Sequence, residues 1–308
     1  MRLRHWLRKE NSGLFQTTLE LAHYEERQGH TITLVNPSDE QVFYSNVDDP
    51  EIEIVHSQMG LSAYGDHHIP RFMWMHGEPL SSVGNGVSMK AIVDLAPMMD
   101  AFICMRQEER AVWNTIKRTY YVPKGIDLER FYPLSDPPEK LSGEPAVLYY
   151  ENWRGSRNPL YLCIAMQQVW QKYPKARLHL YNCNNQKMYE TFHALIKHNK
   201  WWPFVRTLTG PVQDVNLLLN KADIVVSCLY PLYARSIEAF GAGKALLAPG
   251  YRDCRYPFKC DLDPDSLARA IIQCHENYDQ IDYRAWAEQN HDVAETVRQS
   301  IEIYERYL

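Results

Sequence analysis

Short apolar runs alternate with longer amphipathic stretches along most of this 308-residue chain. We interpret the runs as strands and the stretches as helices, because parallel strands that are covered on both faces are apolar throughout and are connected by helices. The expected strands of the first half are residues 2–7, 31–35, 51–57, 71–77, 101–105 and 120–123. Those of the second half are residues 146–150, 176–182, 204–208, 222–229 and 244–249. The pattern predicts the α/β class, with one parallel sheet in each half.

A proline-rich segment separates the two halves. Residues 133–145, PLSDPPEKLSGEP, contain four prolines and no apolar period, which is typical of a linker. We therefore predict a Rossmann-like domain over residues 1–137 and a second one over residues 138–284. Residues 285–308 read as one uninterrupted amphipathic helix, which either packs back on the first domain or caps the end of the chain.

Composition excludes several classes of protein. With 33 Lys and Arg against 38 Asp and Glu, the net charge of −5 gives no global electrostatic reason to bind nucleic acid or an anionic membrane. No stretch approaches the ~18 apolar residues of a membrane span, and the basic amino terminus lacks the apolar segment of a secretory signal, so we expect a cytoplasmic protein. The seven cysteines lack the paired spacings of a zinc site and are expected to be buried as small apolar residues.

Two doubly wound domains place a ligand in a central cleft, at the carboxyl ends of their strands. The dinucleotide fingerprint is missing, since only Gly13 stands in the first loop and the Gly84–Gly86 pair lacks a third glycine. A triphosphate-binding loop is missing as well, because Gly243 and Lys244 are followed by alanine. A nicotinamide enzyme and an ATPase are therefore not expected.

Five segments resemble the retaining glycosyltransferases of the GT-B fold, in particular family 4. They are residues 11–35, 72–79, 120–133, 151–159 and 230–250. The most specific are VPKGIDLERFYP (122–133) and a Glu-Ala pair followed by a glycine-rich turn similar to the family's A-x-G-K (238–244). The resemblance implies two Rossmann-like domains and transfer of a sugar from a nucleotide-diphosphate donor, most often a UDP-sugar, to a hydroxyl acceptor. It also implies retention of configuration, with no metal and no further cofactor.

The donor is expected on the second domain. If a helix starts at Ala234, the amides of Ala234, Arg235 and Ser236 and the positive end of the helix dipole favour a diphosphate there. The resemblance implies that Glu238 accepts hydrogen bonds from a ribose. Alternatively, Glu238 only stabilises the start of the helix.

Two arginines and a histidine complete the predicted catalytic group. Arg154 and Arg157 follow the strand at 146–150, where guanidinium groups could stabilise charge on a leaving diphosphate; the alternative is a pair of solvated loop arginines. His76 follows the strand at 71–77, and the resemblance implies that it lies against the donor sugar, although a structural histidine is the other interpretation. Ser12 and Gly13 would lie near the donor phosphate and acceptor, or form an ordinary helix cap.

Two features depart from the family pattern. Tyr230 stands where the family has a second glutamate that helps to read the donor sugar. A phenol, or Arg235 and its neighbours, could take over this role. In the first strand, Arg2 and Arg4 interrupt the apolar pattern, and Arg8 follows, so we expect an imperfect edge strand or, alternatively, a basic rim for an acidic acceptor.

These departures keep other functions open. The chain could bind a nucleotide sugar without turnover, or epimerise a nucleotide sugar on the same fold. A third alternative is glycosylation of a modified DNA base. The acceptor itself, whether glycan, lipid, small molecule or modified base, is not indicated by any motif.

Overall fold

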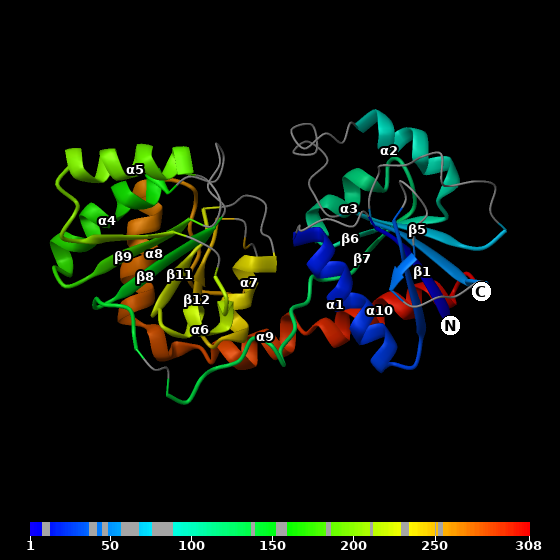
Figure 1. The fold of residues 1–308 in the computed structure, drawn as a ribbon. Helices are drawn as coiled ribbons and strands as arrows, with labels where there is room; N and C mark the ends of the chain where they lie inside the picture. Colours follow the sequence, from blue (N-terminus) through cyan, green and yellow to red (C-terminus); the bar gives the residue numbers. More distant parts are fainter. Residues whose placement is uncertain are drawn as a thin grey trace. The chain divides into compact units, whose positions relative to one another are not determined.

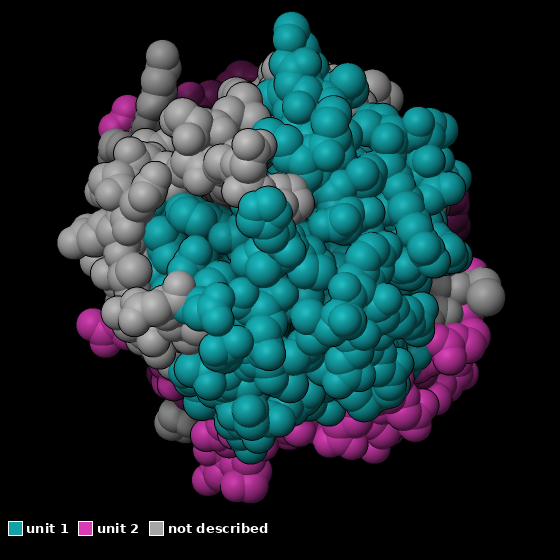
Figure 2. Space-filling view, turned by 90° about the vertical axis from the view of Figure 1, so that its right-hand side faces the viewer, with its two compact units in different colours: residues 1–127, 290–308 teal, residues 128–289 magenta. Residues whose placement is uncertain are grey.

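The computed structural model describes residues 1–7, 13–36, 42–44, 49–56, 68–75, 89–136, 139–151, 159–182, 186–209, 212–228, 234–249, 251 and 255–308. The chain divides into two compact units. Unit 1 comprises residues 1–127 and 290–308, teal in Figure 2, and unit 2 comprises residues 128–289, magenta. Each unit contains one sheet with helices on it (Figure 1), which confirms the predicted α/β class with two Rossmann-like units.

Unit 1 has a seven-stranded sheet in the order β3-β2-β1-β4-β5-β6-β7. Its strands are β1 (Arg2–Trp6), β2 (Thr31–Val35), β3 (Val42–Tyr44), β4 (Ile52–Val55), β5 (Arg71–Met75), β6 (Ala101–Cys104) and β7 (Thr119–Tyr121). Its helices are α1 (Gly13–Arg27), α2 (Met89–Leu95), α3 (Gln107–Trp113) and α10 (Val293–Glu305), with a short 3-10 turn, η3 (Ala96–Met98). All neighbouring strands are parallel except β3, an edge strand that the sequence did not predict and that runs antiparallel to β2.

Two apolar layers cover the sheet of unit 1. One packs α1 and α10 on it, through residues such as Leu21, Val297 and Tyr304. The other packs α2 and α3 on it, through Ile92 and Trp113. Strands β4, β5 and β6 are buried at every position, which explains why they are mostly apolar. The two charged residues among them, Glu53 and Arg71, pair with each other.

The edge-strand prediction for residues 2–7 is wrong, since β1 lies between β2 and β4 in the middle of the sheet. Carboxylates from residues 49–53 of the same polypeptide explain how arginines are accommodated there. Arg2 lies near Asp49 and Glu51 at the strand's end, and the Arg4 guanidinium lies 3.5 Å from Glu53 on β4. Arg2 is exposed and Arg4 is half-buried, so both cations keep contact with water as well as with these carboxylates.

Unit 2 has a five-stranded parallel sheet in the order β10-β9-β8-β11-β12. Its strands are β8 (Ala146–Glu151), β9 (Arg177–Asn182), β10 (Val205–Thr209), β11 (Ile224–Val226) and β12 (Ala245–Leu247). Its helices are α4 (Leu160–Lys172), α5 (Gln186–His198), α6 (Val215–Asn220), α7 (Ala234–Gly241), α8 (Pro264–Glu276) and α9 (Tyr283–Asn290), with a 3-10 turn, η4 (Tyr278–Gln280).

The chain leaves unit 1 after Asp127, before the proline-rich segment that we predicted as the linker. The residues that follow are held by unit 2. Phe131 is buried, the Tyr132 amide donates to Asn216 Oδ1, and the Leu134 amide donates to Asn220 Oδ1. Backbone hydrogen bonds to two buried asparagines thus fix a segment whose composition alone indicates a free linker.

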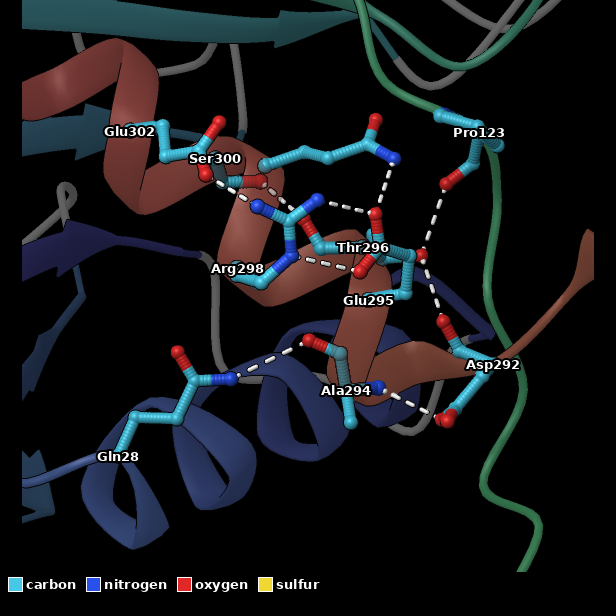
Figure 3. Close-up of polar contacts among 10 residues, drawn as sticks. Gln28, Pro123, Asp292, Ala294, Glu295, Thr296, Arg298, Ser300 and Glu302 are labelled. Carbon is cyan, nitrogen blue, oxygen red and sulfur yellow. Dashed lines mark hydrogen bonds and ion pairs between the residues drawn. The ribbon is translucent and has the colours of Figure 1, made fainter.

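The carboxyl-terminal segment is not the single helix that we predicted. It consists of α9 and α10, separated at His291 and Asp292. Asp292 has an extended backbone and its carboxylate accepts from the Ala294 amide, so it starts a new helix (Figure 3). Amphipathic periodicity continues across the break and therefore does not reveal it.

The start of α10 crosses the segment that leaves unit 1. The Ile126 amide donates to His291 O, and the Thr296 hydroxyl donates to Pro123 O (Figure 3). A Cβ on Gly125 would lie 2.3 Å from Val293 Cα. The glycine of the VPKGID motif is therefore required by close backbone approach within unit 1.

Two smaller predictions are also confirmed. Gly29 ends α1 with φ of 88°, as expected for a glycine that stops a helix. The cysteines that the structure describes, residues 104, 163, 228, 260 and 274, are all free and buried, and Cys183 and Cys254 lie outside the described residues. Burial raises the pKa of the Cys163 thiol to about 12, which is consistent with an apolar role.

Candidate functional site

The candidate site lies at the carboxyl edge of the sheet of unit 2. There β8 ends at Glu151, β11 ends at Val226, and α7 begins at Ala234 (Figure 1). β8 and β11 are hydrogen-bonded neighbours, so their ends lie side by side. This is the edge at which open α/β sheets bind their ligands.

Helix α7 is fixed to unit 2 by its apolar face. Ile237, Ala239 and Phe240 are fully buried, whereas Glu238 is half-buried. The first amides of any helix have no acceptor within the helix, and the helix dipole makes this end positive. The start of α7 therefore has the electrostatic properties that an anion requires.

Three polar side chains connect the start of α7 to the two strands. The Ser236 hydroxyl donates to Ser227 Oγ at 2.9 Å, and the Ser227 hydroxyl donates to Glu151 Oε1 at 3.0 Å. All three side chains are at most 2% exposed. Of the three, only Ser236 was predicted from the sequence as a site residue. The one signal for Glu151 in the sequence is its place, as an acidic residue, at the end of an apolar run.

The predicted site residues fall into two groups. Ala234, Arg235, Ser236 and Glu238 lie together on α7, and Gly13 is the first residue of α1. Ser12, His76, Arg154, Arg157 and Tyr230 lie outside the residues that the structure describes. Along the chain, Arg154 and Arg157 come shortly after Glu151, and His76 directly follows β5. Their predicted roles stay predictions.

The two most specific sequence motifs meet within unit 2. Gly243 of the glycine-rich turn at residues 241–244 has φ of 70°, and a Cβ there would lie 3.0 Å from Pro133 Cγ. Arg284 of α9 reinforces this contact, because its Nη1 donates to the carbonyl oxygens of Phe131 at 2.6 Å and Gly241 at 3.2 Å. The segment from 128 to 133 thus supports the carboxyl-terminal end of α7, while the serine chain supports its start.

Unit 1 contains a buried polar cluster that sequence reasoning missed. His5 Nδ1 lies 2.8 Å from His56 Nε2. His5 Nε2 lies 2.8 Å from Glu25 Oε2, an ion-pair distance although the angle is not that of a hydrogen bond. Nearby, the Trp74 indole donates to the Tyr304 hydroxyl at 2.9 Å. Burial and, less strongly, Glu25 raise the pKa of that phenol.

Neither a membrane-spanning helix nor a cluster of metal ligands is present among the described residues. None of the helices described has the length and apolar character needed to cross a membrane. Within the same residues, no three His, Cys, Asp or Glu side chains converge as they would around a metal ion.

Comparison of sequences finds no matching protein-family model and no matching curated protein. Comparison of structures finds similar folds over nearly the whole chain. A glycosyltransferase from Rickettsia africae has a TM-score of 0.76 at 16% identity, with 99% of this chain and 98% of that chain covered. Anabaena HepE in complex with UDP-glucose has a TM-score of 0.73 at 14% identity, with coverage of 99% and 100%.

An alpha-glucosyltransferase in complex with UDP and a 13-mer DNA containing an HMU base has a TM-score of 0.67 at 12% identity, with 99% of each chain covered. At these identities the likeness shows the fold. The resemblance to GT-B glycosyltransferases that the sequence motifs indicated is therefore confirmed as a shared fold.

Proposed function

We propose that this protein is a glycosyltransferase that moves a sugar from a nucleotide-diphosphate donor, in the first place a UDP-sugar, to a hydroxyl acceptor. One observation carries the proposal: α7 begins at the carboxyl edge of the unit 2 sheet, in a fold shared with proteins whose structures contain UDP or UDP-glucose. The sequence motifs that resemble the family lie at both ends of this same helix.

Binding of the donor would rest mainly on unit 2. The first amides of α7, those of Ala234, Arg235 and Ser236, would donate to the diphosphate, and the helix dipole would add to the attraction. Glu238, one turn into the helix, would accept hydrogen bonds from the ribose hydroxyls. Tyr230 would contact the donor sugar where the resembling family uses a carboxylate.

Catalysis would rest on charge stabilisation. As the bond to the anomeric carbon breaks, negative charge collects on the leaving diphosphate, and Arg154 and Arg157 would stabilise it together with the start of α7. His76 would position the sugar, and Ser12 and Gly13 would lie near the phosphate and acceptor. The acceptor proton would pass to the leaving phosphate. We propose retention of configuration and no metal requirement, as the family resemblance implies.

Calorimetric titration of UDP, GDP and ADP tests the donor site. We expect one nucleotide, UDP in the first place, to bind with a chelator present, and Glu238→Ala to weaken it. Glu144→Ala is the matched control, since Glu144 is an exposed carboxylate that precedes β8 at the opposite edge of the same sheet. The proposal fails if the protein binds none of the three nucleotides, or if both variants weaken binding equally.

A modified DNA base is the second acceptor that we consider, because one protein of the same fold was solved with DNA containing an HMU base. Phosphate contacts make duplex binding fall steeply with salt. Binding of a duplex that weakens with salt, together with sugar transfer to such a base, would favour this acceptor. Transfer only to free sugars or lipids would exclude it.

Two assays separate the remaining alternatives. A protein that binds UDP-sugar but neither transfers nor slowly hydrolyses it would be a binding protein. A product that is still a nucleotide sugar would indicate an epimerase.

A further inference from the structure

The chain of hydrogen bonds from Glu151 through Ser227 to Ser236 joins three segments of unit 2 that are far apart in sequence. Glu151 is the last residue of β8, Ser227 directly follows β11, and Ser236 lies in the first turn of α7. We propose that Glu151 and Ser227 are positioning residues for donor binding, which act through Ser236 by fixing the first turn of α7. This inference rests on the proposed function, since it takes the start of α7 as the diphosphate site.

The direction of the hydrogen bonds gives each residue its role. A carboxylate only accepts, and each serine hydroxyl has one hydrogen. The hydrogen of Ser227 goes to Glu151, and that of Ser236 goes to Ser227. The Ser236 hydroxyl therefore has no hydrogen left for a phosphate oxygen, so Ser236 contributes its backbone amide to the site and its side chain to the anchor.

Glu151 and Ser227 are too buried to contact a ligand directly. Glu151 is 2% exposed and Ser227 is 1% exposed, so neither offers a surface to a donor. A hydrogen bond to an ionised acceptor is roughly twice as strong as one between neutral groups. With Glu151 ionised, the chain would hold the first turn of α7 against β8 and β11 by a charge-assisted contact within the unit.

Precise placement matters for this kind of site. A group displaced by about 1 Å can lose much of its effect on a bound substrate. If the first turn of α7 shifts or frays, the amides no longer converge on one anion. An ionised Glu151 would also oppose an anion electrostatically, because a buried negative charge near the same helix start repels a diphosphate. Positioning and simple repulsion therefore predict opposite effects when the charge of Glu151 is removed.

The experiment is titration of UDP into the wild-type protein, Ser227→Ala, Ser236→Ala, the double variant and Glu151→Gln. We expect each serine variant to weaken binding by about 10-fold, as is usual when a residue that orients a binding group is lost. The double variant should bind UDP no more weakly than the single variant of lower affinity, because either substitution breaks the same chain of hydrogen bonds. Glu151→Gln should also weaken binding, and Ser236→Thr, which keeps the hydroxyl, should restore it.

Ser300→Ala is the matched control. Ser300 is equally buried and its hydroxyl donates to Thr296 O at 2.7 Å, but it lies on α10 in unit 1. We expect UDP to bind this variant as it binds the wild type. Circular dichroism checks that every variant is folded; if the alanine variants do not fold, Glu151→Gln, which preserves the shape of the side chain, decides the question.

Three results would overturn the inference. In the first, wild-type affinity persists in both serine variants. In the second, Ser300→Ala weakens binding as much as they do. In the third, Glu151→Gln binds UDP more tightly, which would mean that repulsion outweighs positioning. A wild-type protein that binds no nucleotide overturns the proposed function as well, so the two failures are distinguishable.

Discussion

Arg284 is expected to be among the residues that contribute most to the stability of unit 2. Its Nη1 donates to the carbonyl oxygens of Phe131, Leu128 and Gly241 at 2.6, 3.2 and 3.2 Å. One Nη nitrogen has two hydrogens, so these contacts amount to two hydrogen bonds from a charged donor. At ~1.5–3 kcal/mol for each such bond, their loss would cost about 3–6 kcal/mol.

Partial exposure reduces this value. The Arg284 side chain is 26% exposed, so water can replace part of what the guanidinium supplies. We therefore expect Arg284→Met to lower the free energy of unfolding by about 2–4 kcal/mol. With an m-value of about 3 kcal/mol/M, the urea midpoint of unit 2 should fall by about 1 M.

Urea unfolding followed by circular dichroism and tryptophan fluorescence measures this shift. Arg298→Met is the control, because within the described part of the chain Arg298 forms ion pairs only with exposed glutamates on its own helix, including Glu302 (Figure 3). Such pairs contribute little, so its midpoint should stay close to that of the wild type. Equal midpoints for the two variants would refute the argument that Arg284 stabilises the segment from 128 to 133 and the end of α7.

Two further predictions concern backbone approach and pH. Gly125→Ala should destabilise unit 1 by about 3 kcal/mol in thermal unfolding, because its Cβ would lie 2.3 Å from Val293 Cα. Gly29→Ala should cost only about 1 kcal/mol, because the space around Gly29 is open and only its φ of 88° is unfavourable for alanine. Equal losses of stability in the two variants would contradict this. Burial lowers the pKa of His179 below 6.5, although its Nε2 lies 2.8 Å from the Ser142 carbonyl oxygen, which opposes the shift. As the pH falls through 6.5, His179 therefore takes up a proton in the unfolded state before it does so in the folded state. The free energy of unfolding should then decline by at most about 1.4 kcal/mol per pH unit, and His179→Gln should flatten this decline. An unchanged pH profile in the variant would show that other groups cause the decline.

The sequence predicted most strands of this fold because both sheets are buried on two faces. Runs such as AVLYYE need no partner information to be recognised as strands, and a glycine such as Gly29 ends its helix for a local reason. The position of β1 in the sheet was not predictable in this way. Its arginines indicate an edge, and the carboxylates that accompany them in the sheet, such as that of Glu53, come from a segment about 50 residues away.

The candidate site shows the same limit. The site at the start of α7 was predicted from the resemblance of residues 230–250 to the family pattern, in which a Glu-Ala pair precedes a glycine-rich turn. The chain from Glu151 through Ser227 to Ser236 was not, because it depends on which strand ends lie next to the helix. A serine after an apolar run has no distinguishing feature until the fold brings a carboxylate within 3.0 Å of it.

Residues 290–308 belong to unit 1, and this affects the order in which the two units fold during synthesis. Unit 2 is an insertion in unit 1, so a ribosome completes residues 128–289 before it reaches α10. Until then, one apolar layer of the first sheet lacks Val297, Ile301 and Tyr304, and the Trp74 indole lacks the hydroxyl to which it donates. We expect unit 2 to acquire protease resistance on the nascent chain first, although it is encoded second, and unit 1 to do so only when its last helix has emerged.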